Sequence, residues 1–239
     1  MSNGAKVWAA TRLGLVRAAN EDRWRVGGVG GGAADADWAG PLPDDKPWAV
    51  VADGMGGHGA GDVASSVALD TLCSHLGQDG PSDIRSAIAE ANWAVFAAMD
   101  EPFGRRGMGT TLAGFCRAAG RFAVFNVGDS RVYILRGGRL ELLTVDDTLP
   151  RRASGRSNAL TQSLGGTSLP VALDPHFASV KPAAGDSLLI CTDGLTDMLD
   201  EEAVCASLHA ATGNPAAALA DAAVEAGGRD NVTVIVAAF

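Results

Sequence analysis

Hydrophobic residues along this chain occur mostly in short apolar runs, several of them rich in β-branched and aromatic side chains. Short runs of this kind predict strands, and the run at 49–52, which has no polar side to turn toward water, predicts a buried strand. The predicted strands span 6–12, 49–52, 110–116, 121–127, 131–135, 176–180, 187–191 and 230–239.

Apolar residues at helical spacing mark four further segments. The first predicted helix covers 62–76 and the second begins near Pro81. The third covers 200–210. The fourth begins at Asn214, where an N-cap side chain precedes a proline at the first helical position.

Polar and glycine-rich segments separate these elements and predict turns or loops at 14–24, 27–32, 35–45 and 146–158. The glycine run at 27–32 lacks the strand-to-helix context of a nucleotide-binding loop, so we interpret it as a hairpin or loop. Helices and strands come in blocks without regular alternation, which predicts an α+β fold with helical layers against antiparallel sheets. Because no linker is visible, we expect a single domain over 1–239.

Composition narrows the class of protein. The chain is 47% hydrophobic, but no apolar run approaches the ~20 residues that a membrane helix needs. Its N-terminal segment is too broken for a signal peptide, and its four widely spaced cysteines predict free thiols in a reducing compartment. We therefore expect a cytoplasmic protein without membrane contact. The net charge of −9 argues against nucleic-acid binding.

Four aspartates stand at the ends of predicted strands: Asp53, Asp129, Asp193 and Asp230. An isolated Asp-Gly pair more often makes a simple turn, but here an apolar run ends on Asp-Gly twice, at Asp53 and at Asp193. If these strand ends meet, the carboxylates repel one another unless protons or cations neutralise them. Oxygen ligands without convergent His or Cys favour Mg²⁺ or Mn²⁺, and two such ions would activate a water for attack on phosphorus.

A set of collinear motifs resembles one known family, the metal-dependent protein serine/threonine phosphatases of type 2C (PPM family). The motifs are Arg17-x-x-Asn20-Glu21-Asp22, Asp53-Gly-Met-Gly-Gly-His58, Gly109-Thr-Thr111, Asn126-Val-Gly-Asp-Ser-Arg131, Leu143-Thr144, Asn158-x-Leu160-Thr161, Thr192-Asp-Gly194 and Arg229-Asp-Asn231. The match follows the same order along nearly the whole chain. The resemblance implies a four-layer α-β-β-α sandwich of two antiparallel sheets flanked by helix pairs.

The resemblance also implies a set of site residues. Asp53 would bridge two Mn²⁺ or Mg²⁺ ions, and Asp193 and Asp230 would complete the first. The Gly54 carbonyl would bind the second ion, with Glu21 acting through water. Asp129 with Asp193 resembles the third-metal site of bacterial members, and Arg17 would clamp the phosphate. The motifs imply structural roles for Thr110 and Thr111 in a core strand, an ion pair for Arg131 and a turn held by Asn231.

The activity implied is hydrolysis of phosphoserine and phosphothreonine in proteins by a metal-activated water, without a phosphoenzyme. The implied partners are phosphorylated proteins and a cognate Ser/Thr kinase system, and we expect a monomer. The alternative is a pseudophosphatase, a phosphoprotein-binding module without turnover. Retention of Asp53, Asp193 and Asp230 argues against that alternative.

Two departures from the family pattern leave alternatives open. Met55 stands where eukaryotic members place a histidine, so the general acid is either His58 or water, and His58 is equally well explained as a loop residue. The segment 146–157 is shorter than the flap of bacterial relatives and carries Arg151, Arg152 and Arg156. It is either an ordinary solvated loop or a shortened flap whose arginines meet acidic phosphopeptides.

Overall fold

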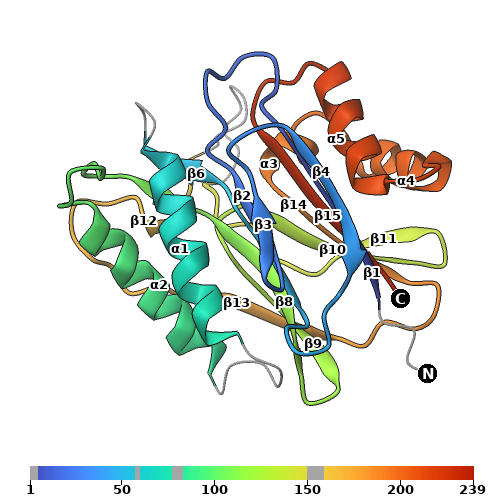
Figure 1. Ribbon diagram of the computed structural model, residues 1–239, viewed down its shortest axis with the longest axis horizontal. Coiled ribbons are helices and arrows are strands. Elements are labelled where there is room, and N and C mark those ends of the chain that lie inside the picture. Colours follow the sequence, from blue (N-terminus) through green and yellow to red (C-terminus); the bar gives the residue numbers. More distant parts are fainter. Residues whose placement is uncertain (1–4, 57–59, 77–82, 150–158) are drawn as a thin grey trace.

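The computed structural model describes residues 5–56, 60–76, 83–149 and 159–239. Two six-stranded antiparallel sheets pack face to face, and a pair of helices covers the outer face of each sheet (Figure 1). The α+β sandwich with outer helical layers that the sequence predicted is therefore confirmed.

The first sheet combines strands from both ends of the chain. Its order is β11 (Arg139–Leu142), β10 (Arg131–Arg136), β14 (Ser187–Cys191), β15 (Val232–Ala238), β1 (Lys6–Arg12) and β4 (Ala36–Pro41). Helices α4 (Glu201–Ala210) and α5 (Pro215–Glu225) pack together, and α5 contacts β1 and β15. As predicted, Asn214 caps α5, because its side chain accepts a hydrogen bond from the Ala217 N–H (3.0 Å).

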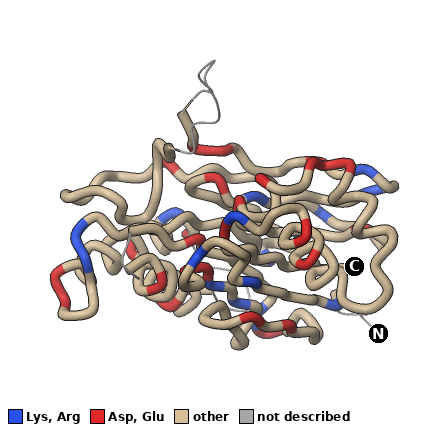
Figure 2. The backbone as a smooth tube through the Cα atoms, turned by 90° about the horizontal axis from the view of Figure 1, so that it is seen from above, with Lys and Arg blue, Asp and Glu red and all other residues tan. Residues whose placement is uncertain are grey.

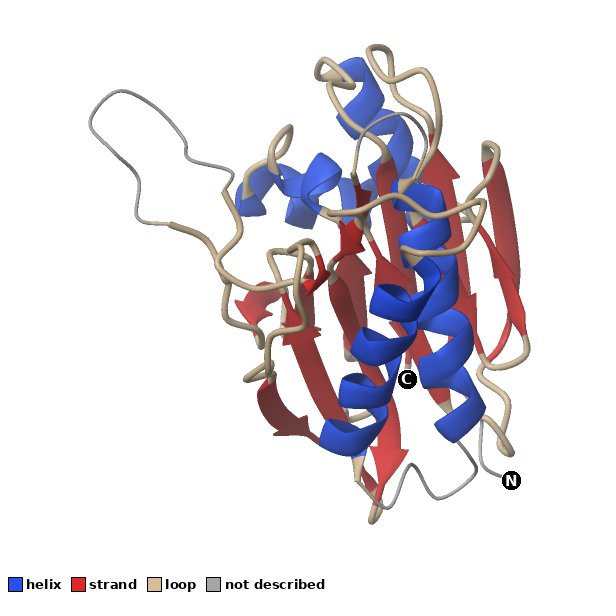
Figure 3. Cartoon of the chain, turned by 90° about the vertical axis from the view of Figure 1, so that its left-hand side faces the viewer, coloured by secondary structure: helices blue, strands red, loops and turns tan. Residues whose placement is uncertain are grey.

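The second sheet carries the other helix pair. Its order is β13 (His176–Val180), β9 (Arg121–Val127), β8 (Leu112–Ala118), β5 (Trp48–Ala52), β2 (Arg23–Val26) and β3 (Val29–Gly31). Helices α1 (Gly61–His75) and α2 (Ile84–Ala98) lie across its outer face (Figure 3). A small sheet of β12 (Leu164–Gly165), β7 (Gly109–Thr110) and β6 (Gly54–Met55) contacts both helices, and the short helix α3 (Asp193–Thr196) follows β14.

Strand β5 explains why the central apolar run has no polar side. All five of its residues are buried. Val51 faces the core between the two sheets, whereas Val50 faces the core beneath α1 and α2. Because successive side chains of a strand point to opposite faces, a strand covered on both faces must be apolar at every position.

One loop prediction was wrong, and a second extended two residues too far. The segment 35–45 contains the edge strand β4, which pairs antiparallel with β1. Its side chains are mostly exposed, so backbone pairing forms the strand without leaving an apolar pattern to detect. The predicted turn at 14–24 ends earlier than expected, because Arg23 and Trp24 already belong to β2. The hairpin interpretation of 27–32 is confirmed by the pairing of β2 with β3.

The predicted free thiols are confirmed. All four cysteines are free, and burial raises the pKa of the Cys116 and Cys191 thiols to about 12, which makes both unreactive. Lys and Arg positions are scattered among the more numerous Asp and Glu positions (Figure 2). Among the described helices, none combines the length and apolarity needed to cross a membrane.

The contact between α1 and β6 is made backbone to backbone, and it generates a stability prediction. A Cβ added to Gly61 would lie 2.6 Å from the Gly54 carbonyl carbon, so Gly61→Ala must push β6 away from α1. We expect this substitution to lower the free energy of unfolding by about 2 kcal/mol. Gly28 is the matched control, because an added Cβ there meets only the Lys46 ammonium at 3.5 Å. Gly28→Ala should change stability by less than about 0.5 kcal/mol in urea unfolding, and an equal cost for both would contradict the close packing.

Candidate functional site

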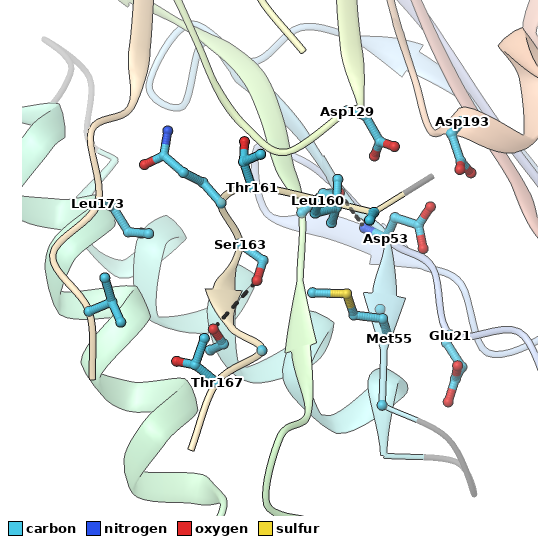
Figure 4. Close-up of a pocket in the computed structure, with 18 of the residues that line it drawn as sticks. Glu21, Asp53, Met55, Asp129, Leu160, Thr161, Ser163, Thr167, Leu173 and Asp193 are labelled. Carbon is cyan, nitrogen blue, oxygen red and sulfur yellow. Dashed lines mark hydrogen bonds between the residues drawn. The ribbon is translucent and has the colours of Figure 1, made fainter. Parts of the chain in front are cut away.

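Acidic side chains line one half of a cavity of about 550 Å³ that lies where β5 and β14 end. All seven residues that the sequence singled out as metal or phosphate ligands line it: Arg17, Glu21, Asp53, Gly54, Asp129, Asp193 and Asp230. Asp53, Asp129 and Asp193 lie around one space, with Glu21 beside it (Figure 4). The structure therefore brings together residues from five separate parts of the chain.

Backbone hydrogen bonds fix the position of Asp53 immediately after β5. Its N–H donates to the Thr111 Oγ1 (3.0 Å), and its carbonyl accepts from the Thr110 Oγ1 (2.9 Å) and the Thr111 N–H (2.9 Å). The Thr111 hydroxyl also bonds to the Ser130 hydroxyl at 2.7 Å, next to Asp129. Both threonines are buried. They therefore link two of the acidic residues and leave the Asp53 carboxylate free to face the cavity.

Glu21 and Gly54 meet at the N-terminus of α1. The Glu21 Oε1 accepts a hydrogen bond from the Gly61 N–H (3.1 Å), which is one of the free donors at the helix start. The Glu21 backbone is held by the Asn231 side chain (2.9 Å) and by the Ser65 hydroxyl (2.6 Å). Since Gly54 packs against Gly61, the carbonyl of Gly54 and the carboxylate of Glu21 are positioned by the same helix end.

Arg17 and Asp230 form an ion pair at the edge of the cavity. The Arg17 Nη2 lies 2.5 Å from the Asp230 Oδ2, and the other Asp230 oxygen accepts from the Asn231 N–H (2.8 Å). The Asn231 side chain donates to the carbonyls of Leu13 and Ala19, so it holds the segment that carries Arg17. The predicted turn-holding contacts of Asn231 are therefore present.

Asp129 lies in the turn between β9 and β10. The preceding Gly128 has a φ of +97°, which favours glycine, and its N–H donates to the Asp147 Oδ2 (3.0 Å). The predicted ion pair of Arg131 is present, because its guanidinium lies 2.6 Å from the Asp146 Oδ2. Contacts on both sides of Asp129 therefore hold the turn.

Crowding changes the protonation of these carboxyls. Burial raises the pKa of Asp53 well above its ordinary value, and the charges of Asp22 and Asp193 add to the effect. Burial and then repulsion by Asp230 raise the pKa of Asp193 to about 6, although a hydrogen bond with Asp53 acts in the opposite direction. Burial, followed by repulsion from Asp193, raises the pKa of Asp129 to about 7. Such shifts in a cavity are typical of functional sites.

The carboxylates surround the cavity without closing on one point. In the described parts of the chain, no three His, Cys, Asp or Glu side chains are arranged closely enough to hold an ion as they stand. Mutual repulsion and the pairing of Asp230 with Arg17 both oppose such closure. The Asp193 Oδ1 is buried and accepts no hydrogen bond from the described residues.

Sequence reasoning gave no role to Asp22 or to Asp147. Asp22 is fully buried, and one of its oxygens accepts from the Thr192 hydroxyl (2.9 Å), next to Asp193. Burial raises its pKa to about 7. Asp147 accepts hydrogen bonds from Gly128 and the Gln162 amide, and it contacts the His176 ring. Both lay in segments interpreted as solvated, and only the motif containing Asp22 offered a signal.

Two sequence hypotheses concern residues outside the described parts of the chain. These residues are His58 as a general acid, and Arg151, Arg152 and Arg156 as flap residues. Both hypotheses therefore stay untested predictions.

Comparison with known proteins agrees with the geometry. The sequence profile described as protein phosphatase 2C matches residues 35–225. The serine/threonine protein phosphatase PstP of Mycobacterium tuberculosis is 33% identical over 248 residues, which cover 96% of this chain but only 44% of PstP. The chain thus spans less than half the length of that relative.

Two solved structures of PstP extend the likeness over the whole fold. The crystal structure of the M. tuberculosis phosphatase has a TM-score of 0.77 at 32% identity and covers 98% of this chain and 99% of that one. The PstP catalytic domain in complex with two manganese ions has a TM-score of 0.71 at 33% identity, with 98% of each chain covered. From the sequence profile, the shared fold and the acidic cavity together, we conclude that this chain belongs to the protein phosphatase 2C family.

Proposed function

We propose that this chain is a metal-dependent phosphatase that hydrolyses phosphoserine and phosphothreonine in proteins. One observation carries the proposal, namely the convergence of Asp53, Asp193 and Asp230 with Arg17 in one cavity. Carboxylates crowded in this way require cations, and a guanidinium beside them offers the charge that a phosphate monoester needs. The likeness to PstP, a serine/threonine protein phosphatase, supports the same activity.

The donor set fits hard divalent cations. The acidic half of the cavity offers only oxygen, and the buried Asp193 Oδ1 has no other partner. We infer that Asp53, Asp193 and Asp230 hold one Mn²⁺ or Mg²⁺ ion. In the same proposal, Asp53 and the Gly54 carbonyl hold a second ion, with Glu21 acting through water, and Asp129 with Asp193 holds a third. The complex of PstP with two manganese ions supports the pair. When bound, the cations neutralise the carboxylates and lower the pKa of water so that it can attack phosphorus at neutral pH.

Arg17 has a separate part in the proposal. Its side chain is about half exposed (52%) and pairs with Asp230 in this structure. Because the Arg17 side chain is partly exposed, its guanidinium can leave Asp230 and turn toward a phosphoryl group in the cavity. There it would donate two parallel hydrogen bonds to phosphoryl oxygens as charge builds on them. Arg17 thus positions the phosphate for attack by water.

Water attacks phosphorus directly, and the bond between phosphorus and the seryl or threonyl oxygen breaks without a phosphoenzyme. The leaving oxygen takes a proton, and the proton donor is either water or His58. Hydrogen bonds from Thr110 and Thr111 to the backbone of Asp53 keep the Asp53 carboxylate in the same position during the hydrolysis.

The wider setting belongs to the same proposal. We propose that residues 1–239 act as one catalytic domain and a monomer, with phosphorylated proteins as substrates and a cognate Ser/Thr kinase system. A cytoplasmic location is supported by the four free cysteines, which are typical of a reducing compartment.

Replacing Asp193 tests the proposal. Asp193→Asn keeps the shape of the side chain but removes a charge, and we expect metal-dependent phosphate release from a phosphothreonine peptide to fall at least about 1,000-fold. Asp45→Asn, at an exposed position away from the cavity, should retain wild-type activity. Calorimetry should show weaker Mn²⁺ binding for Asp193→Asn alone. If the wild-type protein binds Mn²⁺ and the phosphopeptide but releases no phosphate, the pseudophosphatase is the correct alternative.

Replacing Arg17 separates phosphate binding from metal binding. Arg17→Ala removes two charge-assisted hydrogen bonds, so we expect kcat/KM for the peptide to fall about 10- to 100-fold. The kcat/KM of Arg17→Lys should lie between those of the wild-type protein and Arg17→Ala, because an ammonium lacks the planar fork of a guanidinium. Mn²⁺ affinity should not weaken, since Arg17 competes with cations for Asp230. Arg106→Ala, which removes an exposed arginine paired with Asp100, is the control. Unchanged kcat/KM in Arg17→Ala would contradict the clamp.

The raised carboxyl pKa values predict that a rise in pH lowers the stability of the metal-free protein and increases the stabilisation by Mn²⁺. The folded protein holds protons on Asp129 up to about pH 7 and on Asp193 up to about pH 6, whereas an unfolded Asp loses its proton near pH 3.9. The metal-free protein should therefore lose stability as pH rises from about 4 to about 7. Mn²⁺ competes with these protons, so the gain in Tm on adding Mn²⁺ should grow over the same range. Thermal unfolding in EDTA or Mn²⁺ measures both effects, and a gain in Tm that does not depend on pH would argue against metal binding by these carboxyls.

A further inference from the structure

The cavity that holds the acidic residues has a second half of different chemistry. Met55, Leu160, Val171 and Leu173 line it, together with Gln162 and small or hydroxyl-bearing residues. In the described lining, this half has no acidic, basic or histidine side chain. In Figure 4, Met55 and Leu160 lie between the carboxylates and Leu173, so the two halves form one continuous space.

The apolar wall is held in place by hydrogen bonds between polar side chains and its backbone. Asn92 of α2 is buried, and its side chain donates to the Val171 carbonyl (3.1 Å) and accepts from the Gly165 N–H (2.9 Å). Gln162 exchanges hydrogen bonds with the Asp174 backbone at 2.8 and 3.3 Å, which ties the two ends of the wall together. Leu173 also packs against the core beneath α1 and α2. The wall is therefore preorganised.

The distance between the two halves suits side chains that are two residues apart and so lie on the same side of an extended peptide. Met55 is two residues from Asp53, and two residues of extended chain span roughly 7 Å. A phosphoryl group occupies only a small part of a cavity of about 550 Å³. The remaining volume adjoins the position of the phosphorylated side chain, and its walls offer apolar surface without a charged group.

We propose that the apolar half binds an aliphatic side chain, such as Leu, Ile or Met, two residues from the phosphorylated residue, and that it thereby selects among phosphoproteins. The inference rests on the proposed phosphatase function. An aliphatic side chain gains by leaving water. A charged side chain loses hydration and finds no ionic partner on this wall. The wall is thus a specificity determinant for the peptide, separate from the residues that hold the phosphate.

A peptide series tests the preference directly. Phosphothreonine peptides that differ only in the residue two positions before or two positions after the phosphothreonine (Leu, Ala, Asn or Asp) are compared by kcat/KM in Mn²⁺, with p-nitrophenyl phosphate as the reference substrate. We expect Leu to exceed Asn by about tenfold on at least one side, and Asp to be poorer still. Equal rates for all peptides would overturn this inference and leave the phosphatase function intact. Absence of phosphate release from every substrate would instead overturn the proposed function.

A pair of matched valines assigns the preference to this wall. Val171 and Val145 are equally exposed (56% each), and a buried asparagine holds the backbone of each. Only Val171 lines the cavity. Val171→Thr keeps the side-chain shape and makes the wall polar, so it should reduce the Leu-to-Asn preference about threefold. Val145→Thr should keep both the preference and the activity of the wild-type protein. A preference that is unchanged in Val171→Thr, or lowered equally in both variants, would overturn the assignment.

Discussion

Repulsion among carboxylates that share a partly buried cavity is the constraint on which this structure depends. Asp53, Asp129 and Asp193 lie where water is limited, and burial raises the pKa of each. Protons relieve part of the repulsion, and the Arg17 guanidinium relieves another part through its pairing with Asp230. Repulsion among the carboxylates therefore destabilises the acidic half. A divalent cation would neutralise this repulsion more completely than either a proton or an arginine.

The fold tolerates this cost because the backbone around each acidic residue is anchored independently of its carboxylate. Thr111 joins Asp53 to Ser130, Thr192 joins Asp193 to the buried Asp22, and Asn231 joins Asp230 to the segment of Arg17. Each anchor uses hydrogen bonds that are buried or partly buried, where loss of a partner is costly. The apolar cores on both sides of β5 hold the strands themselves. Position is thus set by packing and backbone hydrogen bonds, and the carboxylates are left available for chemistry.

One cavity has two kinds of wall, and under the proposed function each wall would recognise a different part of a phosphoprotein. The acidic half with Arg17 would bind the phosphoryl group that all phosphoserine and phosphothreonine residues share, whereas the apolar half beside Met55 and Val171 would contact side chains that differ between one phosphoprotein and another. The two halves share β6, which carries both Gly54 and Met55. Otherwise the first depends on strand ends and α3, and the second on the segments before and after β12, which Asn92 fastens to α2. Outside Met55, the apolar wall can therefore vary without moving the acidic residues.

The sequence by itself determined the strands with uninterrupted apolar runs, the N-cap of the last helix and the acidic residues at the strand ends. These are local signals, because periodicity, capping and turn chemistry act within a few residues. The edge strand β4 and the buried state of Asp22 depended on tertiary structure, since backbone pairing and enclosure by distant segments leave little local pattern. Only the tertiary structure could show that Arg17 pairs with Asp230, 213 residues away in sequence. The same holds for the apolar wall, whose residues share a cavity with Asp53 through packing and have no common motif.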